Sequence, residues 1–272
     1  MINSIINIFS HAFMYRALIV GSLVALCSSL IGVTLVLRKN STIGDGLSHV
    51  AFASFAIATV LGTSSLEFSI PIVVIVSIFL LKLNESSKVH GDAAIALIAT
   101  SSLAIGTFVI SIKSGVNTDI NNYLFGSILS IGNKELLITI LVSLSIIILY
   151  LCTYNKIFAI TFDEKYAKSI GINTNFYNII IAVICSIVVV LGMKLIGSLL
   201  ISSLIVLPTL SAMQTSKTFK SVIIKSVIIS VLAFILGLII SYYLATPTGA
   251  TVVLINLIIF IIFKVFSLIK KA

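Results

Sequence analysis

The run VIIKSVIISVLAFILGLIISYYL, residues 222–244, decides the fold class because its 23 residues include one charged side chain, Lys225. A helix of roughly 20 apolar residues is long enough to cross the hydrocarbon core of a bilayer. The rest of the 272-residue chain has a similar composition, with 59% apolar and only 9% charged residues. Soluble domains carry about 25% charged residues. The sequence therefore predicts a polytopic membrane protein without a separate soluble domain.

Nine apolar runs are expected to be membrane-crossing helices, with eight as the alternative count. The runs are continuously apolar and too long for the alternating strands of a membrane barrel, so an all-α fold is expected over a single domain, residues 1–272. The runs cover approximately residues 12–37, 46–62, 66–83, 92–112, 134–153, 178–193, 195–213, 222–244 and 249–269. A turn is expected around 192–194, and the sequence leaves open whether 178–213 forms a short tilted helix pair or contains a broken or re-entrant helix.

The basic residues predict how the chain is oriented. With the amino terminus outside, the connections that would face the cytoplasm contain 13 of the 17 Lys and Arg residues. Cytoplasmic connections are enriched in Lys and Arg, so this distribution predicts that orientation and a cytoplasmic carboxy terminus. The net charge of +9 is explained by topology. Nucleic-acid binding is not expected, because no basic patch interleaved with aromatic residues is present.

One acidic residue lies where an apolar run begins. Asp45 is part of IGDGLSHVAFASFAIATVLG, residues 43–62, and His49 follows four residues later. Positions i and i+4 share a helix face, so the two side chains can form half of a site for zinc, manganese or iron. Helix capping is the alternative explanation for Asp45. A titratable His49 inside an apolar run is costly and favours a functional role.

Other reactive side chains have simpler explanations. The three cysteines, Cys27, Cys152 and Cys185, lie in apolar runs without paired spacing and are expected to be packing residues. Several further polar residues are expected to be solvated in loops or at the membrane surface, with a metal or partner contact as the alternative for most of them: His11, Glu67, His90, Asp92, Asp119 and Glu135. The sequence does not identify further metal ligands among them.

The longest connection expected in the cytoplasm, about residues 154–177, contains a short helical pattern. Asp163 and Glu164 open this pattern, and Gly171 fits its carboxyl end. Such a helix either lies passively at the membrane interface or inserts into a partner protein. The residues alone leave both alternatives open.

Four segments, taken in order, resemble the membrane permease subunits of bacterial ABC importers for zinc and manganese, the ABC-3 family. They are IGDGLSHVAFASFAIATVLG (43–62), DINNYLFGSILSI (119–131), FDEKYAKSIGIN (162–173) and GSLLISSLIVLPTLSA (197–212). The resemblance covers nearly the whole chain. It implies an ABC importer permease fold in the bacterial plasma membrane. It also implies a permease homodimer that works with a cytoplasmic ATPase and an extracytoplasmic metal-binding protein.

The resemblance also implies roles for individual residues. The family's GDxLSH motif matches Gly44, Asp45, Leu47, Ser48 and His49, so Asp45 and His49 are the implied metal ligands. The implied coupling segment, which would dock on the ATPase, comprises Phe162, Asp163, Glu164, Lys165, Tyr166, Ala167, Lys168, Ser169, Ile170, Gly171, Ile172 and Asn173.

The expected function is import of divalent transition-metal ions. Zinc is preferred, because histidine modestly favours it and because LFGSILSI (124–131) resembles the zinc members of the family slightly more. Manganese or iron is the alternative. No permanently bound cofactor is expected, and ATP would bind the partner subunit. The chain contains no G-x-x-x-x-G-K-[ST] loop, in agreement with a transport subunit that is not itself an enzyme. An ion-coupled secondary metal carrier is the alternative from another class, but it would need paired intramembrane acids.

Overall fold

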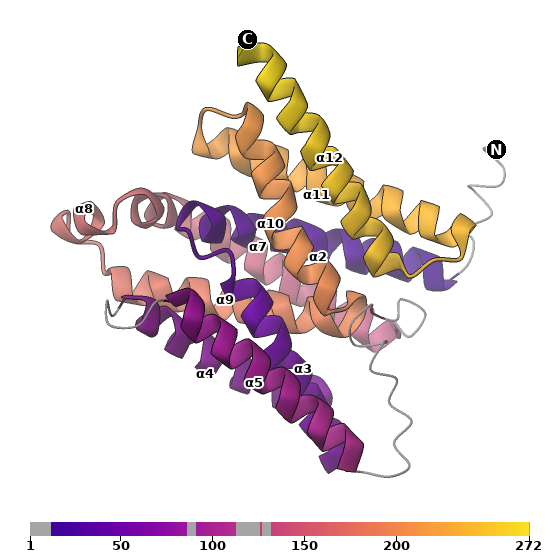
Figure 1. Ribbon diagram of the computed structural model, residues 1–272. Coiled ribbons are helices and arrows are strands. Elements are labelled where there is room, and N and C mark those ends of the chain that lie inside the picture. Colours follow the sequence, from indigo (N-terminus) through magenta and orange to yellow (C-terminus); the bar gives the residue numbers. More distant parts are fainter. Residues whose placement is uncertain (1–11, 86–90, 113–125, 127–131, 272) are drawn as a thin grey trace.

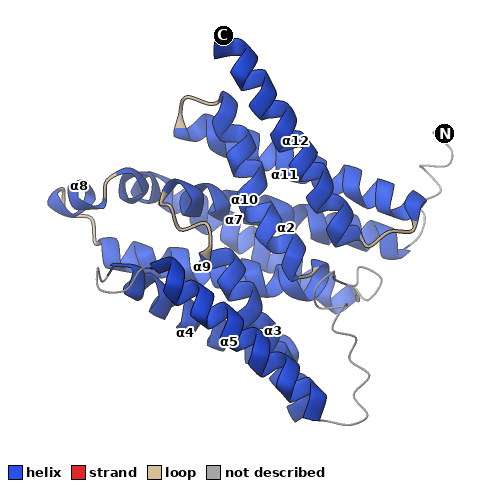
Figure 2. Ribbon diagram, viewed as in Figure 1, coloured by secondary structure: helices blue, strands red, loops and turns tan. Residues whose placement is uncertain are grey.

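The computed structural model describes residues 12–85, 91–112, 126 and 132–271, which form ten helices (Figure 1). Within these ranges the regular structure is entirely helical (Figure 2), so the expected all-α fold is confirmed. The helices are α2 (Ala12–Leu37), α3 (Ile43–Leu61), α4 (Ser65–Glu85), α5 (Gly91–Ile112), α7 (Asn133–Phe162), α8 (Glu164–Ser169), α9 (Thr174–Ile196), α10 (Ser198–Thr215), α11 (Phe219–Leu244) and α12 (Thr248–Lys271).

Each of the nine expected apolar runs coincides with a helix. In the described part of the chain, eight helices are long and apolar enough to cross a membrane, and α4 contributes a shorter apolar stretch, Ser65–Leu81. Helix α4 has 21 residues in all, about 31 Å at 1.5 Å per residue. The difference between eight and nine crossings therefore concerns α4.

Connections lie at alternate ends of the helical bundle. Helix α8 and the α10–α11 turn lie on the left of Figure 1, whereas the α11–α12 turn and the start of α2 lie on the right. A chain that crosses a layer back and forth produces this alternation. Two of the connections that were expected to face the cytoplasm thus lie on the same side.

Helix α10 occupies the middle of the bundle, where it contacts α2, α3, α9, α11 and α12. It is separated from α9 by one residue, Gly197, with φ +96° and ψ +158°, a conformation essentially restricted to glycine. The expected turn at 192–194 is wrong, because these residues are still part of α9. Lys194 stays in that helix because it forms an ion pair with Glu135 of α7, at 2.9 Å. Residues 198–215 form one short helix that contains Pro208.

The central helices approach closely because small residues lie between them. A Cβ atom added to Gly32 of α2 would lie 2.1 Å from the carbonyl oxygen of Ile205 in α10. Buried hydroxyl groups also join α2 to its neighbours. Ser230 of α11 donates to the carbonyl oxygen of Ala25 at 2.9 Å. Small residues and hydroxyl groups are typical of helix interfaces in membranes, where hydrophobicity alone does not drive association.

Candidate metal site and coupling segment

Asp45 lies in the first turn of α3, three residues after the N-cap residue Thr42. The capping alternative for Asp45 is therefore not observed. Its Oδ1 atom instead accepts a hydrogen bond of 3.0 Å from the hydroxyl of Ser202 in α10. The amino-terminal end of α3 still favours the negative charge. Asp45 thus joins the start of α3 to the central helix α10.

His49 lies one turn further along α3, on the same face as Asp45. Its Nε2 atom is 3.9 Å from Oδ2 of Asp45, which is too long for a hydrogen bond. Two zinc ligands, each about 2.1 Å from the metal, are roughly 3.4 Å apart at the tetrahedral angle. A small side-chain rotation would therefore bring the pair to the spacing that one shared ion requires.

The two side chains differ in their surroundings. The side chain of His49 is 23% exposed and that of Asp45 is 61% exposed. The Nδ1 atom of His49 is buried and makes no hydrogen bond within the part of the chain that the structure describes. Buried polar atoms are normally paired. The imidazole is therefore largely enclosed and keeps unused bonding capacity, while the carboxylate remains accessible.

The site contains only part of a metal coordination shell. Among the described residues, no group of three or more His, Cys, Asp and Glu side chains could hold a metal ion. The hydroxyl of Ser202 adds one oxygen beside Asp45. Ser202 could not be identified from the sequence, because one serine among several in an apolar helix gives no sign of a partner 157 residues away.

The other polar candidates have structural roles or lie outside the described residues. His11, His90, Asp119 and, apart from Gly126, the LFGSILSI segment lie outside them. Asp92 accepts a hydrogen bond of 3.1 Å from Thr42, and thereby joins the start of α5 to the start of α3. Glu135 forms the ion pair with Lys194 and Glu67 is exposed. Cys27, Cys152 and Cys185 form no disulfide.

The expected coupling segment, 162–173, contains the short helix α8 between α7 and α9. Asp163 caps α8, because its Oδ1 atom accepts a 2.9 Å hydrogen bond from the backbone nitrogen of Tyr166. Gly171 follows with φ +82°, and Asn173 caps α9 by accepting from the backbone nitrogen of Phe176 at 3.2 Å. The predicted short helix is present.

Large apolar side chains cover the outside of this segment. Phe162, Tyr166 and Ile170 are 61%, 59% and 54% exposed, whereas Ala167 is fully buried. Helix α8 protrudes at the left of Figure 1. The segment therefore presents an apolar surface, defined by Phe162, Tyr166 and Ile170, at one end of the bundle.

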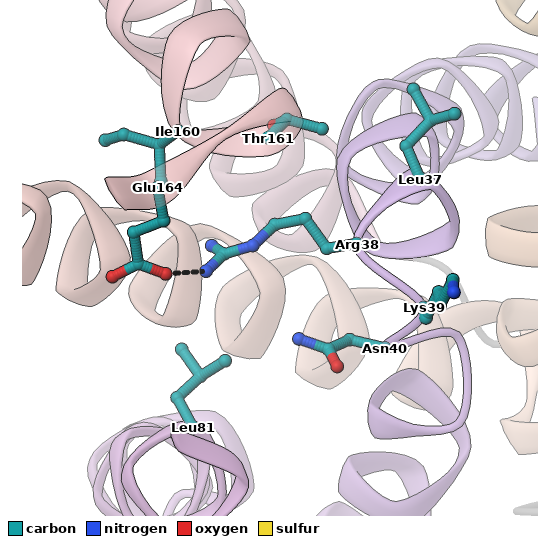
Figure 3. Close-up of a pocket in the computed structure, with 8 residues that line it drawn as sticks. All are labelled: Leu37, Arg38, Lys39, Asn40, Leu81, Ile160, Thr161 and Glu164. Carbon is teal, nitrogen blue, oxygen red and sulfur yellow. Dashed lines mark hydrogen bonds and ion pairs between the residues drawn. The ribbon is translucent and has the colours of Figure 1, made fainter. Parts of the chain in front are cut away.

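Charged side chains connect the amino-terminal end of α8 with the carboxy-terminal end of α2. Arg38 follows α2, and Figure 3 shows its guanidinium facing the carboxylate of Glu164 in α8. The Nη2 atom of Arg38 lies 3.2 Å from Oε2 of Glu164. The pair borders a cavity of about 420 Å³, lined by Leu37, Arg38, Lys39, Asn40, Leu81, Ile160, Thr161 and Glu164. The cavity thus lies between residues of α2, α4, α7 and α8.

Residues 10–267 match the model of the family described as the ABC 3 transport family. The chain belongs to this family. A member of this family is a membrane permease subunit and not the ATPase, in agreement with the helical structure and the sequence.

Relatives in the ABC 3 transport family include proteins named for two different metals. The manganese import system permease protein ScaB of Streptococcus gordonii is 27% identical over 250 residues, 92% of this chain and 90% of that protein. The high-affinity zinc uptake system membrane protein ZnuB of Haemophilus influenzae is 28% identical over 252 residues, 92% of this chain and 95% of that protein.

A solved structure has a similar fold. PsaBC from Streptococcus pneumoniae, in complex with Fab, contains a chain that superposes with a TM-score of 0.87 at 28% identity. The match covers 97% of this chain and 95% of the other. The fold is therefore shared over nearly the whole length of both chains.

Proposed function

We propose that this chain is the permease subunit of an ATP-driven importer for divalent transition-metal ions, with Asp45 and His49 lining the transport path. The observation that carries this proposal is the spacing of the two side chains on α3, beside the hydroxyl of Ser202. Relatives named as manganese and zinc transport proteins support the class of cargo. Carboxylate oxygen with imidazole nitrogen suits these metals better than calcium or magnesium.

The exposure of Asp45 supports a homodimer. Its carboxylate is 61% exposed on the single chain, although α3 is long and apolar enough to cross a membrane. Ionised carboxylates within membrane-spanning helices are rare and normally face protein or a water-filled cavity. A second copy of the permease across a hydrated path would provide that environment.

The two ends of the bundle suit different partners. The apolar surface formed by Phe162, Tyr166 and Ile170 would dock on a cytoplasmic ATPase, which binds the ATP. A metal-binding protein would deliver the ion on the opposite face. In this arrangement the membrane is the bacterial plasma membrane, and the carboxy terminus faces the cytoplasm together with α8.

The docking surface predicts a selective loss of ATPase binding. Tyr166→Ala should weaken the complex with the ATPase about 30-fold, because a truncated aromatic anchor at an interface costs about 2 kcal/mol. Ile170→Ala should have a smaller effect in the same direction. Affinity for the ATPase can be measured with the purified permease in nanodiscs.

The matched control is Tyr243→Ala, because Tyr243 is a similarly exposed tyrosine at the opposite end of the bundle. Equal affinities for Tyr166→Ala and the wild type would exclude this docking surface.

Zinc is the cargo that we propose, because the imidazole of His49 modestly favours it, and manganese is the alternative that relatives such as ScaB support. The test is uptake of Zn²⁺ and of Mn²⁺ into proteoliposomes that contain the permease with its ATPase and metal-binding protein. We expect ATP-dependent uptake, with Zn²⁺ faster than Mn²⁺. Uptake of Mn²⁺ but not of Zn²⁺ would identify manganese instead of zinc as the cargo, and the proposed permease function would stand. Uptake of neither metal would overturn the proposed function.

A further inference from the structure

We propose that Arg38, Glu164 and Asn178 form a positioning network that transmits the movement of α8 to the metal-binding pair Asp45 and His49. This inference rests on the proposed function and adds a role for three residues that neither bind the metal nor form the apolar docking surface. The structure supports it in three ways: a closed set of hydrogen bonds, a short and ordered connection to α3, and a cavity beside the pair.

The network is a closed ring of three side chains from three elements. Arg38 donates through Nη1 to Oδ1 of Asn178 in α9 at 2.8 Å, and through Nη2 to Oε2 of Glu164 at 3.2 Å. Asn178 donates through Nδ2 to Oε1 of Glu164 at 3.4 Å. The planar guanidinium therefore donates from both of its terminal nitrogens, to two different side chains. A lysine could not reproduce this arrangement.

The network is more enclosed than an ordinary surface ion pair. The side chains of Arg38 and Glu164 are 11% and 27% exposed, and Asn178 is 5% exposed. Lys168 also contacts Glu164 at 3.2 Å, but it is 57% exposed and belongs to α8 itself. That second pair cannot transmit movement out of α8. Arg38 is the member that joins α8 to the end of α2.

The connection from Arg38 to the metal-binding pair is short and ordered. Asp45 is seven residues after Arg38. The backbone nitrogens of Arg38 and Asn40 donate to carbonyl oxygens of Thr34 and Leu35 in α2, at 3.2 and 2.8 Å. The nitrogen of Ile43 donates to the carbonyl oxygen of Asn40 at 3.2 Å. Since hydrogen bonds hold the backbone at residues 38, 40 and 43, a displacement of Arg38 would move the start of α3 rather than be absorbed by the connection.

The cavity leaves space beside the start of α8. Its volume of about 420 Å³ lies directly beside the Arg38–Glu164 pair, between α2, α4, α7 and α8 (Figure 3). Packed interiors resist small displacements because neighbouring side chains must shift as well. Glu164 is the residue of α8 that lines this cavity, so its side chain is not packed tightly on that side, while the network joins it to Arg38.

The experiment measures the number of metal ions transported per ATP hydrolysed by the complete permease–ATPase complex in proteoliposomes, with Zn²⁺ and Mn²⁺ as probes. Arg38→Gln should lower this ratio about tenfold, because hydrogen bonds to a charged group are lost. ATP hydrolysis and copurification of the ATPase should stay within twofold of the wild type. Lys39→Gln is the matched control, since Lys39 is the neighbouring basic residue and is exposed. It should leave the ratio unchanged.

A second set of variants tests whether the residues act as a unit. Glu164→Gln should lower the ratio as well, and the double variant Arg38→Gln/Glu164→Gln should be no worse than the more impaired single variant. If Arg38→Gln fails to reach the membrane, Arg38→Lys replaces it and should give an intermediate ratio. An unchanged ratio in Arg38→Gln or its replacement, or additive losses in the double variant, would overturn the inference. If the wild type transports neither metal, the proposed function fails. That result differs from one in which the wild type transports metal and the variants match it, which overturns only the positioning network.

Discussion

Asp45→Ala and His49→Ala should each lower metal uptake by roughly 100-fold, because removal of even an indirect metal partner costs 10- to 100-fold. Asp45 and His49 are expected to contact the ion directly from one face of α3. The measurement is uptake of Zn²⁺ and Mn²⁺ by cells that carry each variant, at equal membrane levels of permease. Direct binding of Zn²⁺ to the purified permease should weaken in parallel.

Two further variants sharpen this prediction. Ser202→Ala should reduce uptake by only a few-fold, because it removes one hydrogen bond to Asp45 and no metal ligand that we propose. Glu67→Ala is the matched control, since Glu67 is also an acid in the first turn of a helix and is exposed. It should leave uptake unchanged. Wild-type uptake in both Asp45→Ala and His49→Ala would refute the assignment of the site.

The second large effect is expected at Gly32. Gly32→Ala should lower the free energy of unfolding by about 3 kcal/mol, near the upper end for overpacked interiors. The reason is that the new methyl group would meet the backbone of Ile205, at 2.1 Å from its carbonyl oxygen, and no side-chain rotation can relieve this contact. The thermal unfolding midpoint in detergent should fall by roughly 10 °C.

Gly132→Ala provides the comparison for Gly32→Ala. A Cβ atom at Gly132 would meet nothing closer than Oε2 of Glu135, at 3.9 Å. The unfolding midpoint of this variant should stay within about two degrees of the wild type. A Gly32→Ala protein as stable as the Gly132→Ala protein would show that α2 and α10 are not in close backbone contact.

The helices could be predicted from the sequence because lipid imposes a strong requirement for apolar side chains. Nine apolar runs gave nine helices, and the Asp45–His49 spacing predicted a shared face. The helices that carry Asp45, His49 and Ser202 are also the least apolar of the eight candidate spans. Mean hydropathy is 1.3 for α3 and 1.5 for α10, against 2.1 to 2.9 for the others. Both helices pack against other helices of the chain, which accommodates a polar residue such as Ser202, whereas the side chain of Asp45 stays 61% exposed on the single chain.

Contacts between distant parts of the chain could not be predicted in the same way. The Ser202–Asp45 and Arg38–Glu164 pairs join residues 157 and 126 positions apart. Neither pair leaves a recognisable pattern in the sequence near its residues, because each contact depends on how the helices pack. The wrong turn at 192–194 has a related cause. The helix continues through these residues to Ile196, and the charge of Lys194 within it is compensated by Glu135 of a different helix.

The single-residue connection at Gly197 has a consequence for how the protein enters the membrane. Helix α10 has 18 residues, about 27 Å of helix, which is slightly less than the ~30 Å of a bilayer core. With a mean hydropathy of 1.5 it is also a weak insertion signal. Because Gly197 leaves no loop between them, α10 would enter the bilayer together with the strongly apolar α9, as a helical hairpin delivered in one step by the insertion machinery.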